Sequence, residues 1–192
     1  LSIDLQVVAG GPQLQSGYFV VGSALLLVGV AFKMSWIPFH MWTPDVYQGA
    51  PAPVTGFLAG AVKVAVFAFA MRWLMMAQGD YLDLLLLGLT VMAVLSMVMG
   101  NLLALRQNNL KRLLGYSSIA HMGYVIVTLA ASATHGATTL STALEGAGIY
   151  LLTYASMTML AFAVISQLAA QDRRFESGTL VHYEGLLFQQ PL

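Results

Sequence analysis

Five long apolar stretches run along the chain, separated by short polar segments. A helix needs about 20 mainly apolar residues to cross the hydrocarbon layer of a bilayer. We therefore predict five transmembrane helices, at about residues 17–39, 53–76, 81–105, 113–131 and 142–168. In this prediction residues 1–16 are an external segment, and residues 171–192 are a cytoplasmic connector to a helix outside this chain.

The first of these helices is predicted to be discontinuous. Pro38 removes a backbone hydrogen-bond donor and its ring clashes with the preceding turn, so the helix should kink or break there. Pro44, Pro51 and Pro53 should then keep the connector non-helical to about residue 52. The predicted fold class is an all-α membrane protein with about five transmembrane helices, one of them discontinuous and proline-broken.

Composition supports the membrane assignment. Only 8% of the 192 residues are charged and 58% are hydrophobic, whereas about a quarter of a soluble domain is charged. There is no cysteine and the net charge is zero, which gives no support to a thiol-based metal site or to nucleic-acid binding. We find no phosphate loop, metal-spaced cluster or hydrolase triad, so no cofactor or metal is expected to bind this chain.

The basic residues predict the orientation of the helices, because cytoplasmic loops are rich in lysine and arginine. The segment between the third and fourth helices is basic, the tail after the fifth is basic, and the segment between the fourth and fifth is not. The segment between the third and fourth helices and the tail after the fifth should therefore be cytoplasmic, and the segment between the fourth and fifth helices should be external. The basic residues in question are Arg106, Lys111, Arg112, Arg173 and Arg174.

Lys63 is the strongest candidate for chemistry. It lies ten residues into the second predicted helix, which is about 15 Å at the usual helical rise and close to the midplane of a bilayer. A charge at that depth is costly and usually faces a partner or a water-filled path. Because burial weakens an amine's preference for its charged form, Lys63 can load and unload a proton. The alternative is a structural lysine bonded to backbone carbonyls.

Lys33 and His121 are further candidates for proton transfer. Lys33 lies near the end of the first helix, where it can either snorkel to the interface or face a cavity at the helix break. His121 lies about 12 Å into the fourth helix, and histidine titrates near physiological pH. It can relay protons or simply bond to a neighbouring helix. The predicted proton-transfer residues are therefore Lys33, Lys63 and His121.

Two long motifs resemble signatures of the antiporter-like subunits of respiratory complex I. The first runs from Phe32 to Pro51 (FKMSWIPFHMWTPDVYQGAP) and the second from Asn109 to Tyr124 (NLKRLLGYSSIAHMGY). Within that family, the form of residues 43–51 is similar to the branch called subunit N, or chain 2, of the bacterial NADH:quinone oxidoreductase. The resemblance implies an inverted-repeat antiporter-like fold, in which the helices of this chain are the seventh to eleventh.

The resemblance also implies a function. Lys33 and Lys63 match the lysines of the seventh and eighth helices on the family's central polar axis, whereas its glutamate in the fifth helix and lysine in the twelfth lie outside this chain. The implied activity is that of a proton-translocating subunit of NADH:quinone oxidoreductase, a translocase that couples quinone reduction to proton pumping. Two alternatives stay open, namely a cation/proton antiporter subunit of a separate complex and a structural membrane scaffold.

The expected setting follows from the same resemblance. The partners are other membrane subunits of complex I, the lipid bilayer and protons, with no nucleic acid. NADH, flavin, iron–sulfur clusters and quinone are expected in other subunits, so this chain performs no redox chemistry itself. The location is the bacterial inner membrane, as a multi-pass protein, with the thylakoid or mitochondrial inner membrane as the alternative.

Overall fold

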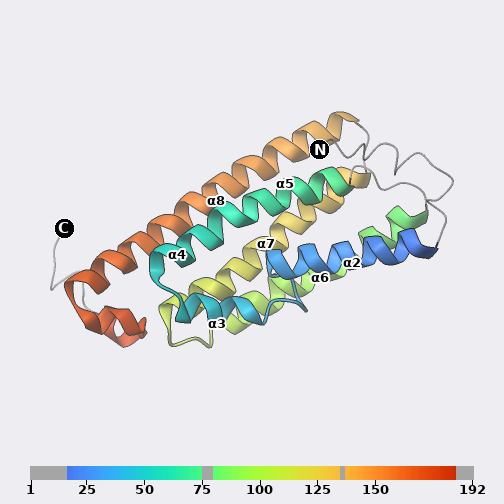
Figure 1. Ribbon diagram of the computed structural model, residues 1–192. Helices are drawn as coiled ribbons and strands as arrows, with labels where there is room; N and C mark the ends of the chain where they lie inside the picture. The colour runs from blue at the N-terminus through green and yellow to red at the C-terminus, as the bar shows by residue number, and fades with distance from the viewer. Residues whose placement is uncertain (1–16, 75–79, 135–136, 185–192) are drawn as a thin grey trace.

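The structure is a computed structural model that describes residues 17–74, 80–134 and 137–184. In those ranges the chain is almost entirely helical and has no β-strand, only an isolated bridge. The helices lie side by side in an elongated bundle (Figure 1). In chain order they are α2 (Gly17–Met34), α3 (Trp42–Gly49), α4 (Ala52–Phe57), the π-helix η2 (Leu58–Val62), α5 (Lys63–Leu74), α6 (Asp80–Ala104), α7 (Leu110–Thr134), α8 (Ala137–Gln171) and the 3-10 helices η3 (Arg173–Ser177) and η4 (Leu180–Tyr183). The predicted external segment, 1–16, and the end of the predicted connector, 185–192, lie outside the described residues.

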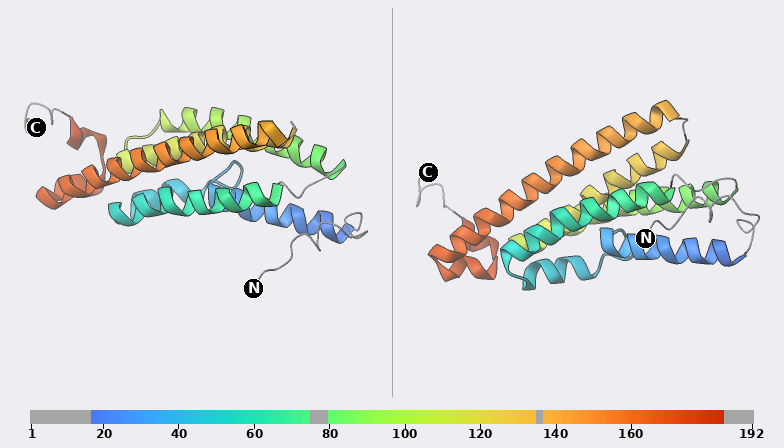
Figure 2. Two further views of the ribbon diagram at one scale, coloured as in Figure 1. Left: turned by 90° about the horizontal axis from the view of Figure 1, so that it is seen from above. Right: turned by 45° about the horizontal axis from the view of Figure 1, so that its top comes forward.

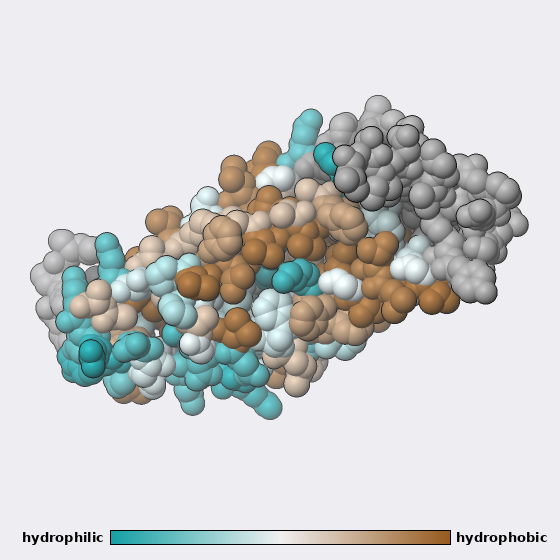
Figure 3. Space-filling model, in the orientation of Figure 1, coloured by the Kyte–Doolittle hydropathy of each residue, from teal (hydrophilic) through white to brown (hydrophobic). Residues whose placement is uncertain are grey.

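The length and composition of the helices confirm the prediction of an all-α membrane protein. Large apolar side chains such as Leu25, Leu87 and Leu152 point outward, and Figure 3 shows apolar surface along the bundle with polar residues gathered toward its lower left. Lipid tails accept such surface as readily as a protein core does. Among the described residues, four helices are long and apolar enough to cross a membrane, with a shorter apolar helix at Val21–Met34; the four lie at Ala52–Trp73, Leu85–Ala104, Leu110–Ala131 and Glu145–Gln171.

The first membrane helix is discontinuous, and the break lies at Ser35. Ser35 adopts a left-handed conformation with φ of 65°. Its backbone N–H donates to the carbonyl of Phe32 at 3.1 Å, and that of Trp36 donates to the carbonyl of Ala31 at 2.8 Å. This pair of bonds is a Schellman motif, which satisfies the last carbonyls of a helix. The side chain of Thr43 holds the turn by donating to Ser35 Oγ at 2.5 Å.

Two details of the predicted break are wrong. The helix was predicted to reach residue 39 and to break at Pro38, but the capping motif ends α2 at Met34, before the proline is reached. The connector was predicted to be non-helical to residue 52, but α3 occupies much of it. Pro44 is tolerated there as the third residue of α3, because the N–H groups of a first helical turn have no partner within the helix.

The other four predicted helices are present, with shifted ends. The helix predicted at 53–76 is continuous from α4 through η2 to α5, and α6 matches the prediction of 81–105 to within one residue at each end. Both α7 and α8 are longer than the predicted 113–131 and 142–168. The last helix was predicted to start at residue 142, but α8 begins at Ala137.

Close packing joins α6 to α7. A Cβ added at Gly100 would lie 2.8 Å from the backbone nitrogen of Ala120, and one at Gly123 would lie 2.7 Å from Met97 Cγ. Small residues let membrane helices approach at this range. On the other side of the bundle, α4 and η2 run along α8, as the two views of Figure 2 show.

The loop between α6 and α7 lies against the C-terminal 3-10 helices at one end of the bundle. Leu110 N–H donates to the carbonyl of Gly178 at 2.7 Å, and Leu180 N–H donates to the carbonyl of Asn108 at 2.9 Å. The two basic segments that were predicted to share the cytoplasmic side are therefore neighbours in space.

Gly100→Ala should destabilise the contact between α6 and α7 by about 1–3 kcal/mol, the usual cost of overpacking. The reason is that the added methyl group would meet the backbone of Ala120, which cannot swing aside as a side chain can. Thermal denaturation of the purified complex measures this effect. The matched control is Gly88→Ala in the same helix, where nothing lies within 4 Å of the added atom. Equal denaturation temperatures for the two variants would contradict the close packing.

Cysteine labelling should test the orientation, because the chain has no cysteine of its own. We expect Leu105→Cys and Val181→Cys, at positions that are 84% and 66% exposed, to react with a membrane-impermeant maleimide from the cytoplasmic side only. Arg72→Cys, at an exposed position near the opposite end, should react only from the external side. Labelling in right-side-out and inside-out vesicles measures this. Reaction of Leu105→Cys and Val181→Cys from opposite sides would show that the orientation is wrong.

Candidate functional site

A π-helical turn precedes the most deeply buried cation. Lys63 follows η2 directly and is 1% exposed. Single π turns inside α-helices are frequent at functional sites. The turn contains the small residues Ala59 and Gly60, and a Cβ on Gly60 would lie 2.8 Å from Met159 Cε. These small residues therefore allow α8 to approach the helix that carries the lysine.

The amine of Lys63 is bound by a serine. Its Nζ donates a hydrogen bond to Ser118 Oγ on α7. The hydroxyl of Tyr154, on α8, donates to the same Ser118 oxygen at 2.6 Å. The Tyr154 ring centroid is 5.9 Å from Nζ, within the range of cation–π attraction. None of the ion pairs between described residues includes Lys63, so a charged Lys63 is stabilised there by the Ser118 hydroxyl and an aromatic face.

His121 lies beside this group on α7. It is three residues beyond Ser118, so the two side chains share one face of the helix. Its Nδ1 lies 2.6 Å from the hydroxyl of Tyr150, and its ring centroid lies 5.3 Å from that of Tyr154 and 5.9 Å from that of Tyr124. A phenol can donate to a neutral imidazole nitrogen or accept from a protonated one. The imidazole is half-buried and enclosed by aromatic rings.

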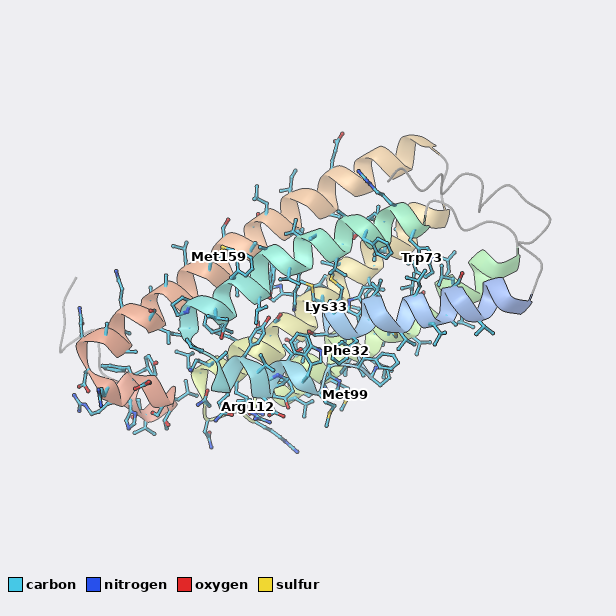
Figure 4. All side chains as sticks on the ribbon, viewed as in Figure 1. Phe32, Lys33, Trp73, Met99, Arg112 and Met159 are labelled. Carbon is cyan, nitrogen blue, oxygen red and sulfur yellow. The ribbon has the colours of Figure 1, made fainter. Side chains whose placement is uncertain are left out.

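Lys33 does not join this group. It lies in the last turn of α2 with its side chain exposed, and Figure 4 labels it at that end of the helix. Within the part of the chain that the structure describes, its amine makes no hydrogen bond or ion pair. Of the three predicted residues, Lys63 and His121 therefore share one cluster and Lys33 lies apart. Their role in proton transfer stays a prediction.

Three hydroxyl groups that were not among the predicted site residues complete the cluster. Ser118 is hydrogen-bonded to Lys63 and Tyr150 to His121, while the hydroxyl of Tyr154 is hydrogen-bonded to Ser118. A signal was available, because Tyr150 and Tyr154 are four residues apart in an apolar helix and so form a polar stripe on one face. The sequence could not show that this stripe faces Ser118 and His121, because that depends on how α7 and α8 pack.

α3 is fastened to the start of α7 by basic side chains. Arg112 Nη1 donates to Asp45 Oδ1 at 2.6 Å and to Gln48 Oε1 at 3.1 Å. Lys111 Nζ donates to the carbonyl of Ala50 at 3.3 Å, just beyond the C-terminal end of α3, where a cation also suits the helix dipole. Both basic residues were predicted as positive-inside anchors, and the structure gives each a specific partner as well.

Tyr47 is buried by this attachment. Its ring meets that of Phe162 edge-on, with centroids 5.8 Å apart, and its Cδ2 lies 3.5 Å from the point where a Cβ on Gly115 would stand. Its hydroxyl is buried and has no hydrogen-bond partner among the described residues. The sequence did not predict that Tyr47 is buried, because it belongs to a segment that was predicted to be a loop.

A cavity of about 500 Å³ lies between the α3–α4 turn and the end of α8, with Lys111 and Arg173 in its lining. It does not include Lys63 or His121. The described residues contain no group of three or more His, Cys, Asp or Glu side chains that could hold a metal ion.

Comparison with known proteins finds a matching family and similar solved structures. Residues 4–192 match the family described as NADH:quinone oxidoreductase/Mrp antiporter, transmembrane. The chain is similar to a chain of respiratory complex I from Thermus thermophilus, solved with bound aureothin, with 39% identity and a TM-score of 0.66, over 87% of this chain and 38% of that one. It is also similar to a chain of the membrane-bound sulfane sulfur reductase, an archaeal respiratory membrane complex, with 29% identity and a TM-score of 0.64, over 73% of this chain and 28% of that one. The chain thus spans well under half the length of either.

Proposed function

This chain belongs to the NADH:quinone oxidoreductase/Mrp antiporter transmembrane family, and from that premise we propose that it is a proton-translocating membrane subunit of an NADH:quinone oxidoreductase. The similarity to a chain of Thermus thermophilus respiratory complex I supports the proposal. Residues 43–51 favour the subunit N branch of the family. Because the chain spans 38% of that complex I chain, it carries part of a transport pathway, and the rest lies in segments outside it.

The observation that carries the proposal is the environment of Lys63. An adjacent carboxylate would hold the amine in its charged form, because opposite charge stabilises a protonated lysine. Lys63 has a hydroxyl partner instead, and no ion pair with any described residue. Its charge state can therefore respond to a charge that appears nearby, which is the property a proton carrier requires.

The proposed mechanism is electrostatic. Positive charge brought close to Lys63 favours release of its proton, and removal of that charge favours reloading. In this mechanism His121 exchanges protons within the same cluster, and Lys33, at the helix break, passes a charge change along the central polar axis. Such coupling requires a group whose charge differs between two conformations. Redox chemistry belongs to other subunits, which hold the NADH, flavin, iron–sulfur and quinone sites.

A cation/proton antiporter subunit of a separate complex is the second candidate. The family description includes Mrp antiporters, and a chain of the archaeal sulfane sulfur reductase is 29% identical. The greater identity to the complex I chain, 39%, favours the first candidate. A structural scaffold is the third, and it requires both Lys33 and Lys63 to be dispensable in an assembled complex.

The proposed setting is the bacterial inner membrane. The chain would be a multi-pass subunit in contact with lipid and with other membrane subunits of complex I, and its transported species would be protons. A thylakoid or mitochondrial inner membrane is the alternative setting.

We expect Lys63→Ala in the full-length subunit to lower proton pumping and quinone-reductase turnover together by about tenfold or more, since a positioned proton-transfer group contributes about 10²–10⁴-fold. Pumping is measured in membrane vesicles with a pH-sensitive dye, alongside NADH:quinone turnover, after assembly of the complex has been verified.

The control is Arg106→Ala, which removes a cation from the exposed α6–α7 loop and should leave both activities unchanged. If an assembled complex with Lys63→Ala pumps protons at the normal rate and at the normal ratio to quinone-reductase turnover, the lysine is structural. The scaffold hypothesis then replaces the proposal.

A further inference from the structure

Each protonatable group in the buried cluster has a hydroxyl as its hydrogen-bond partner. Lys63 Nζ is bonded to Ser118 Oγ, and His121 Nδ1 lies 2.6 Å from the hydroxyl of Tyr150. Neither group forms an ion pair with any described residue. The shared pattern points to a requirement for partners that carry no charge of their own.

We propose that Ser118, oriented by Tyr154, is the positioning residue that lets Lys63 be held equally well with and without its proton. The inference rests on the proposed function, because it assigns the residue that makes Lys63 reversible as a proton carrier. Ser118 lies within the second sequence motif and Tyr154 outside both, and neither was predicted to be a proton-transfer residue.

The argument begins with the hydrogen-bonding capacity of Ser118. A hydroxyl group has two acceptor positions and one donor proton. Tyr154 occupies one acceptor position with a 2.6 Å hydrogen bond, and the charged amine of Lys63 occupies the other. When Lys63 is neutral, its nitrogen has a lone pair, and the donor proton of Ser118 can turn toward it. The contact then reverses direction without any change in the covalent bonds of the serine.

Tyr154 is needed because it restricts the orientation of the serine. With one acceptor position of Ser118 taken by the phenol, the other is left for the charged amine of Lys63. The tyrosine is itself buried on α8. α8 is held close to the helix that carries Lys63, since Ala155 and Met159 pack against Gly60 of η2.

Other side chains at position 118 would fail in opposite ways. Alanine would leave a charged Lys63 without its acceptor, and a buried donor that loses its partner is destabilised. Aspartate would form an ion pair and favour the charged amine. Of these three side chains, only the serine hydroxyl can both accept from a charged Lys63 and donate to a neutral one.

The experiment compares variants of position 118 in the assembled complex. We expect Ser118→Ala and Ser118→Asp each to lower coupled proton pumping by about tenfold or more, the scale of a lost proton-transfer group. Ser118→Thr keeps the hydroxyl and should stay within about threefold of the wild type, because the added methyl group affects packing alone. Tyr154→Phe should fall between these limits. The matched control is Ser117→Ala, at the preceding position of α7, whose side chain makes no hydrogen bond in the described part of the chain.

The Ser118→Asp variant tests whether Ser118 has the proposed role or a purely structural one. If Ser118 only anchors α7 to Lys63, Ser118→Asp should bind the amine more strongly and pump normally, and that result would overturn the proposal. Pumping within twofold of the wild type by an assembled Ser118→Ala complex would also overturn it. Lys63→Ala shows whether a negative result contradicts only this inference or the proposed function as well. If Lys63→Ala abolishes pumping while Ser118→Ala and Ser118→Asp pump normally, only this inference fails, whereas normal pumping by Lys63→Ala removes the proposed function itself.

Discussion

The protein must accommodate an amine in an apolar helical bundle, and much of its structure follows from that constraint. Lys63 is 1% exposed and has no carboxylate partner among the described residues. A buried cation without hydrogen-bond acceptors is strongly destabilising. Three separate helices meet to supply the solution, because η2 leads into the lysine, α7 provides Ser118, and α8 provides the hydroxyl and ring of Tyr154. Helix packing and the chemistry of the lysine are therefore parts of the same problem.

The broken helix answers a related constraint. Backbone groups cannot be left unpaired in lipid, so a helix that stops inside a membrane protein needs partners at its end. The Schellman motif at Ser35 satisfies the last carbonyls of α2, and Thr43 fixes the turn from α3. α3 is in turn attached to α7 through Arg112 and Lys111. The start of the helix that carries Ser118 and His121 is thus joined to the break, which provides a physical connection between the two regions.

The positions of the membrane helices were predictable because each depends on a local property, an apolar stretch bounded by polar residues. The exact ends were less so. The end of α2 depends on a left-handed Ser35 that a residue eight positions away stabilises, and α3 forms despite Pro44 because the proline falls in its first turn. Lys63 and His121 stood out as ionisable residues in apolar segments. Ser118 did not, since a serine hydroxyl in a membrane helix can equally bond to its own backbone, and Tyr150 and Tyr154 did not, since a tyrosine there can equally serve packing.

The sequence by itself determined that this is a multi-helix membrane protein, that its first helix is interrupted, and that cations lie within its apolar segments, because hydropathy and charge are properties of each residue. Only the tertiary structure decided which of those cations share a site. Lys33 and Lys63 are both cations in apolar segments, yet one is exposed at the end of α2 and the other is enclosed by α7 and α8. Burial and hydrogen-bond partners are set by how the helices pack. A contact such as that of Lys63 with Ser118, 55 positions apart in the chain, therefore cannot be predicted from the local sequence pattern.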